Sequence, residues 1–167
     1  MNELRHPNSA IQQALTPVVG LPLRCIGRAA NMLWAHFGEM REVPTRNGGT
    51  KSVGERAIHV QCPWRVCNLG RIVIAYHDFY YSPEGKPLKD DWDTLGKSRF
   101  DSVADLLCTE FEKTPPVVTS IDLDDVGGFS LHFSHNYRLD VFPDDSSDSG
   151  EHWRIFEPGA GSKNFIL

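Results

Sequence analysis

Apolar residues recur at every second position in several short stretches of the chain, and this period is typical of half-buried β-strands. The clearest example is 57–66, where the alternating apolar residues are Ile58, Val60, Cys62 and Trp64. Similar stretches, bounded by turn residues such as glycine and proline, predict strands at 31–37, 71–75, 117–123, 129–133, 137–142, 152–156 and 164–167. We therefore expect about eight short strands, arranged mostly as antiparallel β-sheet.

One longer stretch, 98–113, has helical spacing instead. Its apolar residues fall on one stripe: Phe100, Val103, Ala104, Leu107 and Phe111. Ser98 or Asp101 can accept hydrogen bonds from the open amides of the first turn, and two consecutive prolines after Thr114 end the helix. The same periodicity places Asp101, Asp105 and Glu112 on the face turned away from the stripe. The pattern predicts an α+β domain whose main helix packs on one face of the sheet.

Two stretches, 31–75 and 130–167, resemble each other. Each contains a His-Phe pair, then a strand and a loop, and then a Trp-Arg pair followed by a turn and an apolar strand. The distance from histidine to tryptophan is 28 residues in the first stretch and 21 in the second, and the difference falls in the loop. The pattern predicts a single domain, 1–167, with two related four-strand units. Chance similarity between two short β-meanders is the alternative.

The composition is that of an ordinary globular domain. The chain has 167 residues, 40% of them hydrophobic and 23% charged, which suffices for one core. Because no apolar run approaches the roughly 20 residues of a membrane-spanning helix, and the first residues lack a signal-peptide pattern, we expect no membrane association. The four cysteines, Cys25, Cys62, Cys67 and Cys108, have no metal-type spacing. We expect a cytoplasmic protein that keeps them as reduced thiols and folds without a disulfide or a metal ion.

Charge is distributed unevenly along the chain. Residues 1–75 hold nine Lys and Arg against four Asp and Glu, whereas 76–167 hold eight against eighteen. The formal net charge of −5 argues against nucleic acid as a partner, since phosphate contacts supply much of that affinity. The acidic half could instead steer a basic protein toward this chain, and an ordinary solvated surface is the alternative.

No catalytic or cofactor motif is assembled in the sequence. Cys62 shares a strand face with Ile58 and Val60, so we interpret it as a core residue and not as a nucleophile. The histidines lack metal-site spacing, and no glycine-rich stretch leads into a helix that could hold phosphate, so we expect no cofactor. If both tryptophans of the Trp-Arg pairs point inward, Arg65 and Arg154 point outward. They either clamp a carboxylate or pair with acidic neighbours, and we favour the second.

Three stretches carry a family resemblance: GRAA (27–30), GERAIHVQCPWR (54–65), and FPDD (142–145) followed by GEHWR (150–154). Together they resemble a family of uncharacterised bacterial proteins of similar length, over most of the chain from about Val19. The resemblance implies a bacterial cytoplasmic domain and supplies no catalytic residue. The order of short strands also resembles, in architecture alone, small immunity proteins of bacterial toxin systems.

The pattern as a whole favours a non-catalytic protein-binding domain of the immunity or inhibitor type. The acidic residues expected to attract a basic partner are Asp144, Asp145, Asp148 and Glu151, with Asp122, Asp124 and Asp125. Tyr80, Tyr81 and Trp92 are the expected aromatic anchors. The alternative is a small-molecule-binding domain or small enzyme with a pocket near the aromatic cluster from Tyr76 to Tyr81, His59 and His132. A deep apolar pocket with convergent polar groups favours this alternative, and an open acidic face favours a protein partner.

Overall fold

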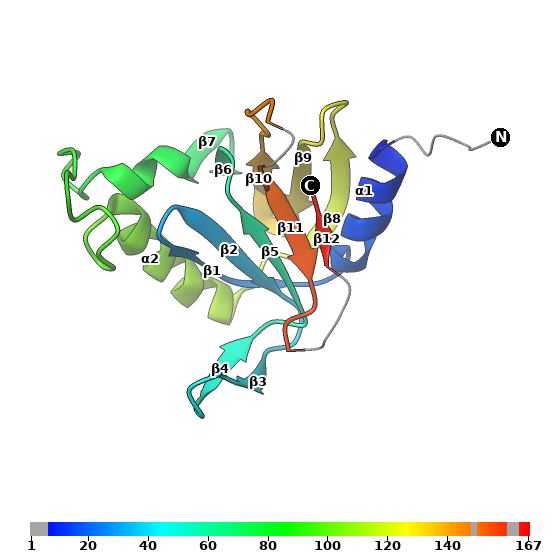
Figure 1. The fold of residues 1–167 in the computed structure, drawn as a ribbon, viewed down its shortest axis with the longest axis horizontal. Coiled ribbons are helices and arrows are strands. Elements are labelled where there is room, and N and C mark those ends of the chain that lie inside the picture. The colour runs from blue at the N-terminus through cyan, green and yellow to red at the C-terminus, as the bar shows by residue number, and fades with distance from the viewer. Residues whose placement is uncertain (1–6, 148–149, 160–163) are drawn as a thin grey trace.

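The computed structural model describes residues 7–147, 150–159 and 164–167. Over these residues the chain forms two α-helices, three short 3-10 helices and twelve strands, and every strand pairing is antiparallel (Figure 1). The predicted α+β class and antiparallel sheet are confirmed. The expected number of about eight strands is wrong, because β1, β3 and β4 lie outside the predicted strand ranges and the 57–66 stretch contains two strands.

Two five-stranded sheets form the body of the molecule. The first sheet has the order β1 (Leu23–Ala29), β2 (Met32–Phe37), β5 (Arg56–Val60), β11 (Trp153–Phe156) and β12 (Phe165–Ile166). The second sheet has the order β7 (Arg71–Ala75), β6 (Trp64–Asn68), β10 (Tyr137–Val141), β9 (Phe129–Phe133) and β8 (Val118–Leu123). A separate hairpin of β3 (Arg41–Pro44) and β4 (Thr50–Val53) projects from the body between β2 and β5 (Figure 1).

The chain changes sheet in the middle of the 57–66 stretch. β5 ends at Val60 in the first sheet, and β6 begins at Trp64 in the second. Pro63, just before β6, has no N–H to donate to a neighbouring strand. The apolar alternation continues through the break because both strands face the same core, where Val60, Cys62 and Trp64 are all buried. The apolar periodicity of 57–66 therefore indicates which residues are buried, but it does not reveal that the chain passes from one sheet to the other.

The two sheets are assembled in the same way. Each combines three strands from one half of the chain with the last hairpin of the other half: β1, β2 and β5 with β11 and β12, and β8, β9 and β10 with β6 and β7. The registers correspond, because Trp153 lies opposite Val60 and Trp64 lies opposite Val141. A helix also precedes each set: α1 (Pro7–Leu15) before β1, and α2 (Arg99–Lys113) before β8. The strand orders of the two units therefore match, the β3–β4 hairpin has no counterpart among the described strands of the second unit, and the duplication stays a prediction.

One hydrophobic core lies between the sheets and includes both buried tryptophans. Phe129 and Trp153, which come from opposite sheets, have ring centroids 4.9 Å apart. The apolar stripe of α2 closes one side of this core against β1, as the helical spacing predicts, with Phe100, Ala104, Leu107 and Phe111 buried.

The start of α2 is fixed by Ser98 and Asp101. The Asp101 N–H donates to Ser98 Oγ, which confirms the predicted cap. The predicted outward orientation of Asp101 is wrong: its carboxylate is buried and accepts hydrogen bonds from Nε and Nη2 of Arg28, at 2.7 and 2.8 Å. Burial alone would raise the pKa of Asp101, but the hydrogen bonds from Arg28 and Ser98 outweigh it and lower the pKa. The partner belongs to β1, so the periodicity of the helix could not reveal it.

A disulfide between Cys25 and Cys108 joins β1 to α2, with the two Cα atoms 4.7 Å apart. The expectation that all four cysteines are reduced is therefore wrong for this pair, although Cys62 and Cys67 are free and buried. The two bonded residues lie 83 positions apart, and only the packing of the helix on the strand brings them together. Disulfides persist mainly in oxidising compartments, so this bond removes the basis of the cytoplasmic prediction.

Candidate functional site

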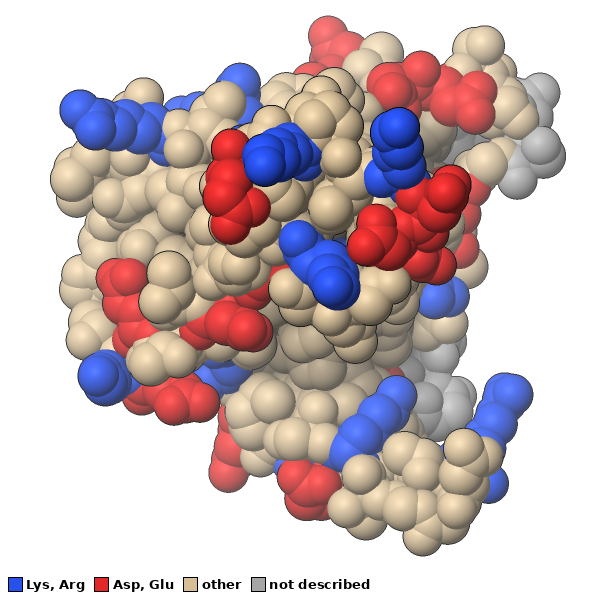
Figure 2. Space-filling view, turned by 90° about the vertical axis from the view of Figure 1, so that its left-hand side faces the viewer, with Lys and Arg blue, Asp and Glu red and all other residues tan. Residues whose placement is uncertain are grey.

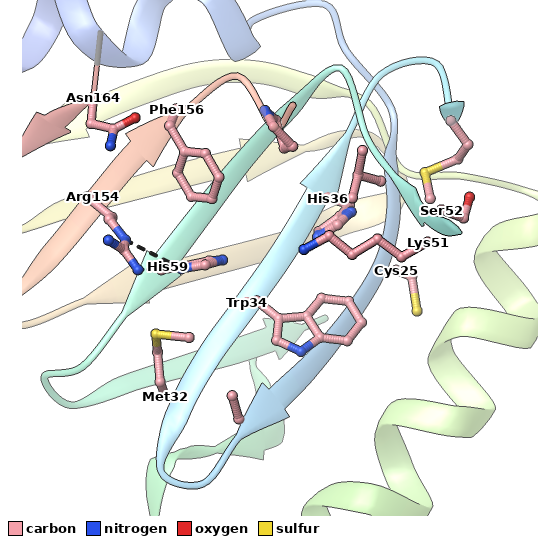
Figure 3. Close-up of a pocket in the computed structure, with 14 residues that line it drawn as sticks. Cys25, Met32, Trp34, His36, Lys51, Ser52, His59, Arg154, Phe156 and Asn164 are labelled. Carbon is pink, nitrogen blue, oxygen red and sulfur yellow. Dashed lines mark hydrogen bonds between the residues drawn. The ribbon is translucent and has the colours of Figure 1, made fainter. Parts of the chain in front are cut away.

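A cavity of about 680 Å³ lies on the outer face of the first sheet, next to β4 of the hairpin (Figure 3). Its floor comes from β2, β5 and β11, and its walls come from β1, β4 and the segment after β11. This volume is typical of small-molecule sites. The lining is mostly apolar, and its large apolar side chains are Met32, Trp34, Met40, Val53 and Phe156.

Two histidines on the floor are held by hydrogen bonds to their Nδ1 atoms. The Gly54 N–H donates to His36 Nδ1 at 2.8 Å, and Nε and Nη2 of Arg154 lie 3.3 and 3.2 Å from His59 Nδ1 (Figure 3). Because both Nδ1 atoms accept, each neutral ring carries its proton on Nε2. Both histidines therefore offer an Nε2–H donor.

Both imidazoles are uncharged at neutral pH. Burial, together with the positive charge of Lys51, lowers the pKa of His36 to about 4. Burial also lowers the pKa of His59 to about 4, with contributions from Arg154, His36 and Lys51. The charged residues that line the cavity within the described part of the chain are Lys51 and Arg154. The cavity is thus lined by four basic side chains, of which only Lys51 and Arg154 carry charge.

The second sheet has a residue pair at the position that corresponds to Arg154 and His59, and there the arginine faces a carboxylate. In the corresponding register, Arg65 lies opposite Asp140 where Arg154 lies opposite His59. Asp140 is buried and is bonded by Arg65 at 2.8 Å, Arg138 at 2.7 Å and Ser130 at 2.7 Å. Burial opposes ionisation there, but these three hydrogen bonds hold the pKa of Asp140 below its usual value. Arg65 therefore has a buried counter-ion, which it shares with Arg138.

Arg154 has a weaker arrangement of partners. Its Nε lies 3.3 Å from Glu151 Oε1, and on the floor it contacts the neutral His59 and lies over the Phe156 ring, 5.6 Å from the centroid. Both outward arginines thus pair with acidic neighbours, as expected from the Trp-Arg pairs. The difference is that a neutral ring replaces the buried aspartate on the first sheet, so the cavity is left with an excess of positive charge.

The residues of the sequence-predicted pocket are not brought together. His59 lines the cavity, but His132 is on the second sheet, where its Nε2 lies 2.7 Å from Asp122 Oδ2. The aromatic cluster forms a 3-10 helix, η2 (Tyr76–Tyr80), that packs against α2. Tyr80 contacts Tyr76 and Trp92, with ring centroids 5.9 and 5.2 Å apart. The prediction that His59, His132 and the aromatic cluster share one pocket is wrong, because β5 is in the first sheet, β9 is in the second sheet and η2 packs against α2.

The predicted acidic residues have different surroundings. Asp144 and Asp145 are exposed between β10 and β11, Glu151 is half-buried beside Arg154, and Asp148 lies outside the described residues. Asp124 accepts hydrogen bonds from the backbone of its own turn, and Asp125 is exposed. The β10–β11 loop and the segment between η2 and α2, which holds two of the expected aromatic anchors, lie apart in Figure 1. On the face shown in Figure 2, acidic and basic side chains are interspersed.

Sequence reasoning named His59 as a residue of the alternative pocket and Arg154 as an outward arginine expected to pair with acidic neighbours, but it did not single out Trp34, His36 or Lys51. A signal for the first two was present, because they occupy alternate positions of a predicted strand on the face opposite its core residues. Lys51 had no comparable signal, since β4 was not recognised as a strand.

Comparison of the chain with protein-family models, curated proteins and solved structures finds no match. The resemblance to a bacterial family therefore stays a prediction. Among the described residues, no helix is long and apolar enough to cross a membrane. In the same part of the chain, no group of three or more His, Cys, Asp or Glu side chains is arranged to hold a metal ion.

Proposed function

We propose that this protein binds a small organic anion in the cavity of the first sheet. The main evidence is the set of polar side chains that line the cavity. Lys51 and Arg154 supply positive charge, and His36 and His59 supply N–H donors. No carboxylate belongs to the described lining. A negatively charged group with apolar substituents matches these donors and the apolar walls, whereas a cation would meet two like charges.

The comparison between the two sheets strengthens this proposal. Arg65 has the buried Asp140 opposite it in the sheet, whereas Arg154 has a neutral ring opposite it, pairs with the half-buried Glu151 at one side and lines an open cavity. A ligand carboxylate would supply the negative charge that the second sheet contains as a side chain. Charge-assisted hydrogen bonds in such a setting contribute about 1.5–3 kcal/mol each, which corresponds to about 10- to 100-fold in affinity.

Calorimetric titration with matched acids and amides tests the proposal. We expect octanoate and 2-naphthoate to bind, and octanamide and 2-naphthamide to bind at least about 10-fold more weakly. Lys51→Met and Arg154→Gln should each weaken binding of the acids by about 10-fold or more. Arg71→Gln is the matched control, because Arg71 is exposed on β7 and does not line the cavity. Equal binding of acids and amides, or an equal loss in the control, would refute the proposal.

A protein partner is the second candidate, favoured by the surface at the end of β10. Asp144 and Asp145 are exposed there, and the adjacent Phe142 is 41% exposed, so acidic charge and an aromatic side chain occur together. If a basic protein binds this surface, Asp144→Asn and Asp145→Asn should slow association, and added salt should remove the difference. An association rate that ignores both the substitutions and salt would exclude this candidate.

A further inference from the structure

Trp34 lies flat on the first sheet because the residue opposite it is glycine. Gly27 on β1 pairs with Trp34 on β2, and a Cβ atom added to Gly27 would lie 2.0 Å from Cζ2 of the indole. Only a residue without a side chain allows this approach. One face of the indole therefore rests on the β1 backbone.

The other face of the indole is turned to the cavity. Trp34 lines the pocket, and Figure 3, which looks into it, shows the ring broadside beside His36 and below the end of Lys51. His36 meets the indole at an angle of 62°, with centroids 5.0 Å apart, so it packs at an angle and does not stack on the ring. A flat aromatic surface is thus available for stacking, within reach of the basic cluster.

The charges near the cavity indicate how much negative charge the ligand carries. Lys51 and Arg154 contribute two positive charges, and Glu151 beside Arg154 contributes one negative charge. A monoanion balances the single remaining positive charge. A dianion would introduce an excess negative charge into a partly buried site, which is unfavourable.

We propose that the ligand is a planar aromatic monocarboxylate whose ring stacks on Trp34 and whose carboxylate lies among Lys51, His59 and Arg154. This proposal rests on the proposed function and deepens it, because anion binding alone does not require an aromatic ring. Stacking of a flat ring on the indole adds about 0.5–1.5 kcal/mol to the binding free energy beyond the effect of its buried area, or about 2- to 10-fold in affinity.

The test compares four probes by calorimetric titration at pH 7.5: 2-naphthoate, 2-naphthamide, the saturated decahydro-2-naphthoate and 2-naphthyl phosphate. The phosphate is mostly a dianion at this pH, because its second pKa is about 6. We expect 2-naphthoate to bind about 5-fold or more tightly than the saturated acid and the phosphate, and about 10-fold or more tightly than the amide.

Two variants remove the stacking surface without changing the charges. Trp34→Leu deletes the indole, and Gly27→Ala displaces it, since the new Cβ would overlap the ring. Both should reduce 2-naphthoate to the affinity of the saturated acid and leave the saturated acid within about 2-fold. Gly49→Ala is the control, because its Cβ would meet its nearest neighbour at 3.4 Å and Gly49 is not one of the residues that line the cavity.

The outcomes separate this inference from the proposed function. If the saturated acid binds as tightly as 2-naphthoate, or if Trp34→Leu leaves both unchanged, stacking on Trp34 is wrong but anion binding stands. If the phosphate binds most tightly, the monoanion assignment is wrong. If the amide binds as tightly as the acid, or if no probe binds, both proposals are wrong. Circular dichroism of each variant confirms that it is folded before titration.

Discussion

Removing the Cys25–Cys108 disulfide should destabilise the protein strongly. The perturbation is the double variant Cys25→Ser/Cys108→Ser, which keeps a small polar atom at both positions. The hydroxyl introduced at position 108 has a partner in place, because the Cys108 sulfur already lies 3.3 Å from the Ile26 carbonyl oxygen, to which a hydroxyl can donate. The main change is therefore the loss of the covalent link.

The magnitude follows from the length of chain that the bond closes. The two cysteines are 83 positions apart. In the chain-entropy treatment, opening a loop of about 84 residues costs about 4.5 kcal/mol of stability at 25 °C. For a domain of this size each kcal/mol lowers the melting midpoint by about 2–4 °C, so we expect a fall of about 9–18 °C.

Two assays measure the effect. Calorimetry compares the melting midpoint of the wild-type protein with and without dithiothreitol, and the double variant serves as the control because reductant should not change its midpoint. Titration of thiols in denaturant, without reductant, should find the two free cysteines, Cys62 and Cys67. Four reactive thiols, or a wild-type midpoint that reductant shifts by less than about 2 °C, would show that the bond does not stabilise this protein.

Three further predictions follow from buried polar groups. Asp101→Asn should lower the free energy of unfolding in urea by about 3–5 kcal/mol, because it leaves the charge of Arg28 buried without a counter-ion. The double variant Arg28→Met/Asp101→Leu should recover part of that loss. A loss below about 1 kcal/mol for Asp101→Asn would contradict a buried ion pair. Because His36 and His59 have folded pKa values of about 4, against about 6.5 when unfolded, their contribution to stability is complete above pH 6.5 and is lost as the pH falls toward 4. The melting midpoint should therefore decline over that window, and His36→Gln/His59→Gln should flatten the decline; an unchanged slope would refute the assignment. Cys62, whose pKa burial raises to about 12, should react with a thiol reagent at pH 8 more than about 100-fold more slowly in the folded than in the unfolded protein, and fast labelling would show that it is accessible.

The sequence alone determined the main helix and most of the strands of this protein. The stripe from Phe100 to Phe111 and the cap at Ser98 defined α2 to within a residue of its observed start, because helix periodicity and capping depend on residues close together in the chain. The alternation in 129–133 and 137–142 likewise defined β9 and β10, since the side-chain period of a strand is local. The α+β class followed from these elements.

The tertiary structure decided which elements meet. The apolar period was the same on both sides of Pro63, so only strand pairing shows that the chain crosses there from one sheet to the other. Asp101 and Cys108 have their partners on β1, and the pocket combines Lys51 from β4, His59 from β5 and Arg154 from β11. A periodic pattern indicates that one face of a strand or helix is buried, but it does not indicate which other element covers that face. The partners are fixed by long-range packing of the whole chain, and for that reason the pocket emerged only with the fold.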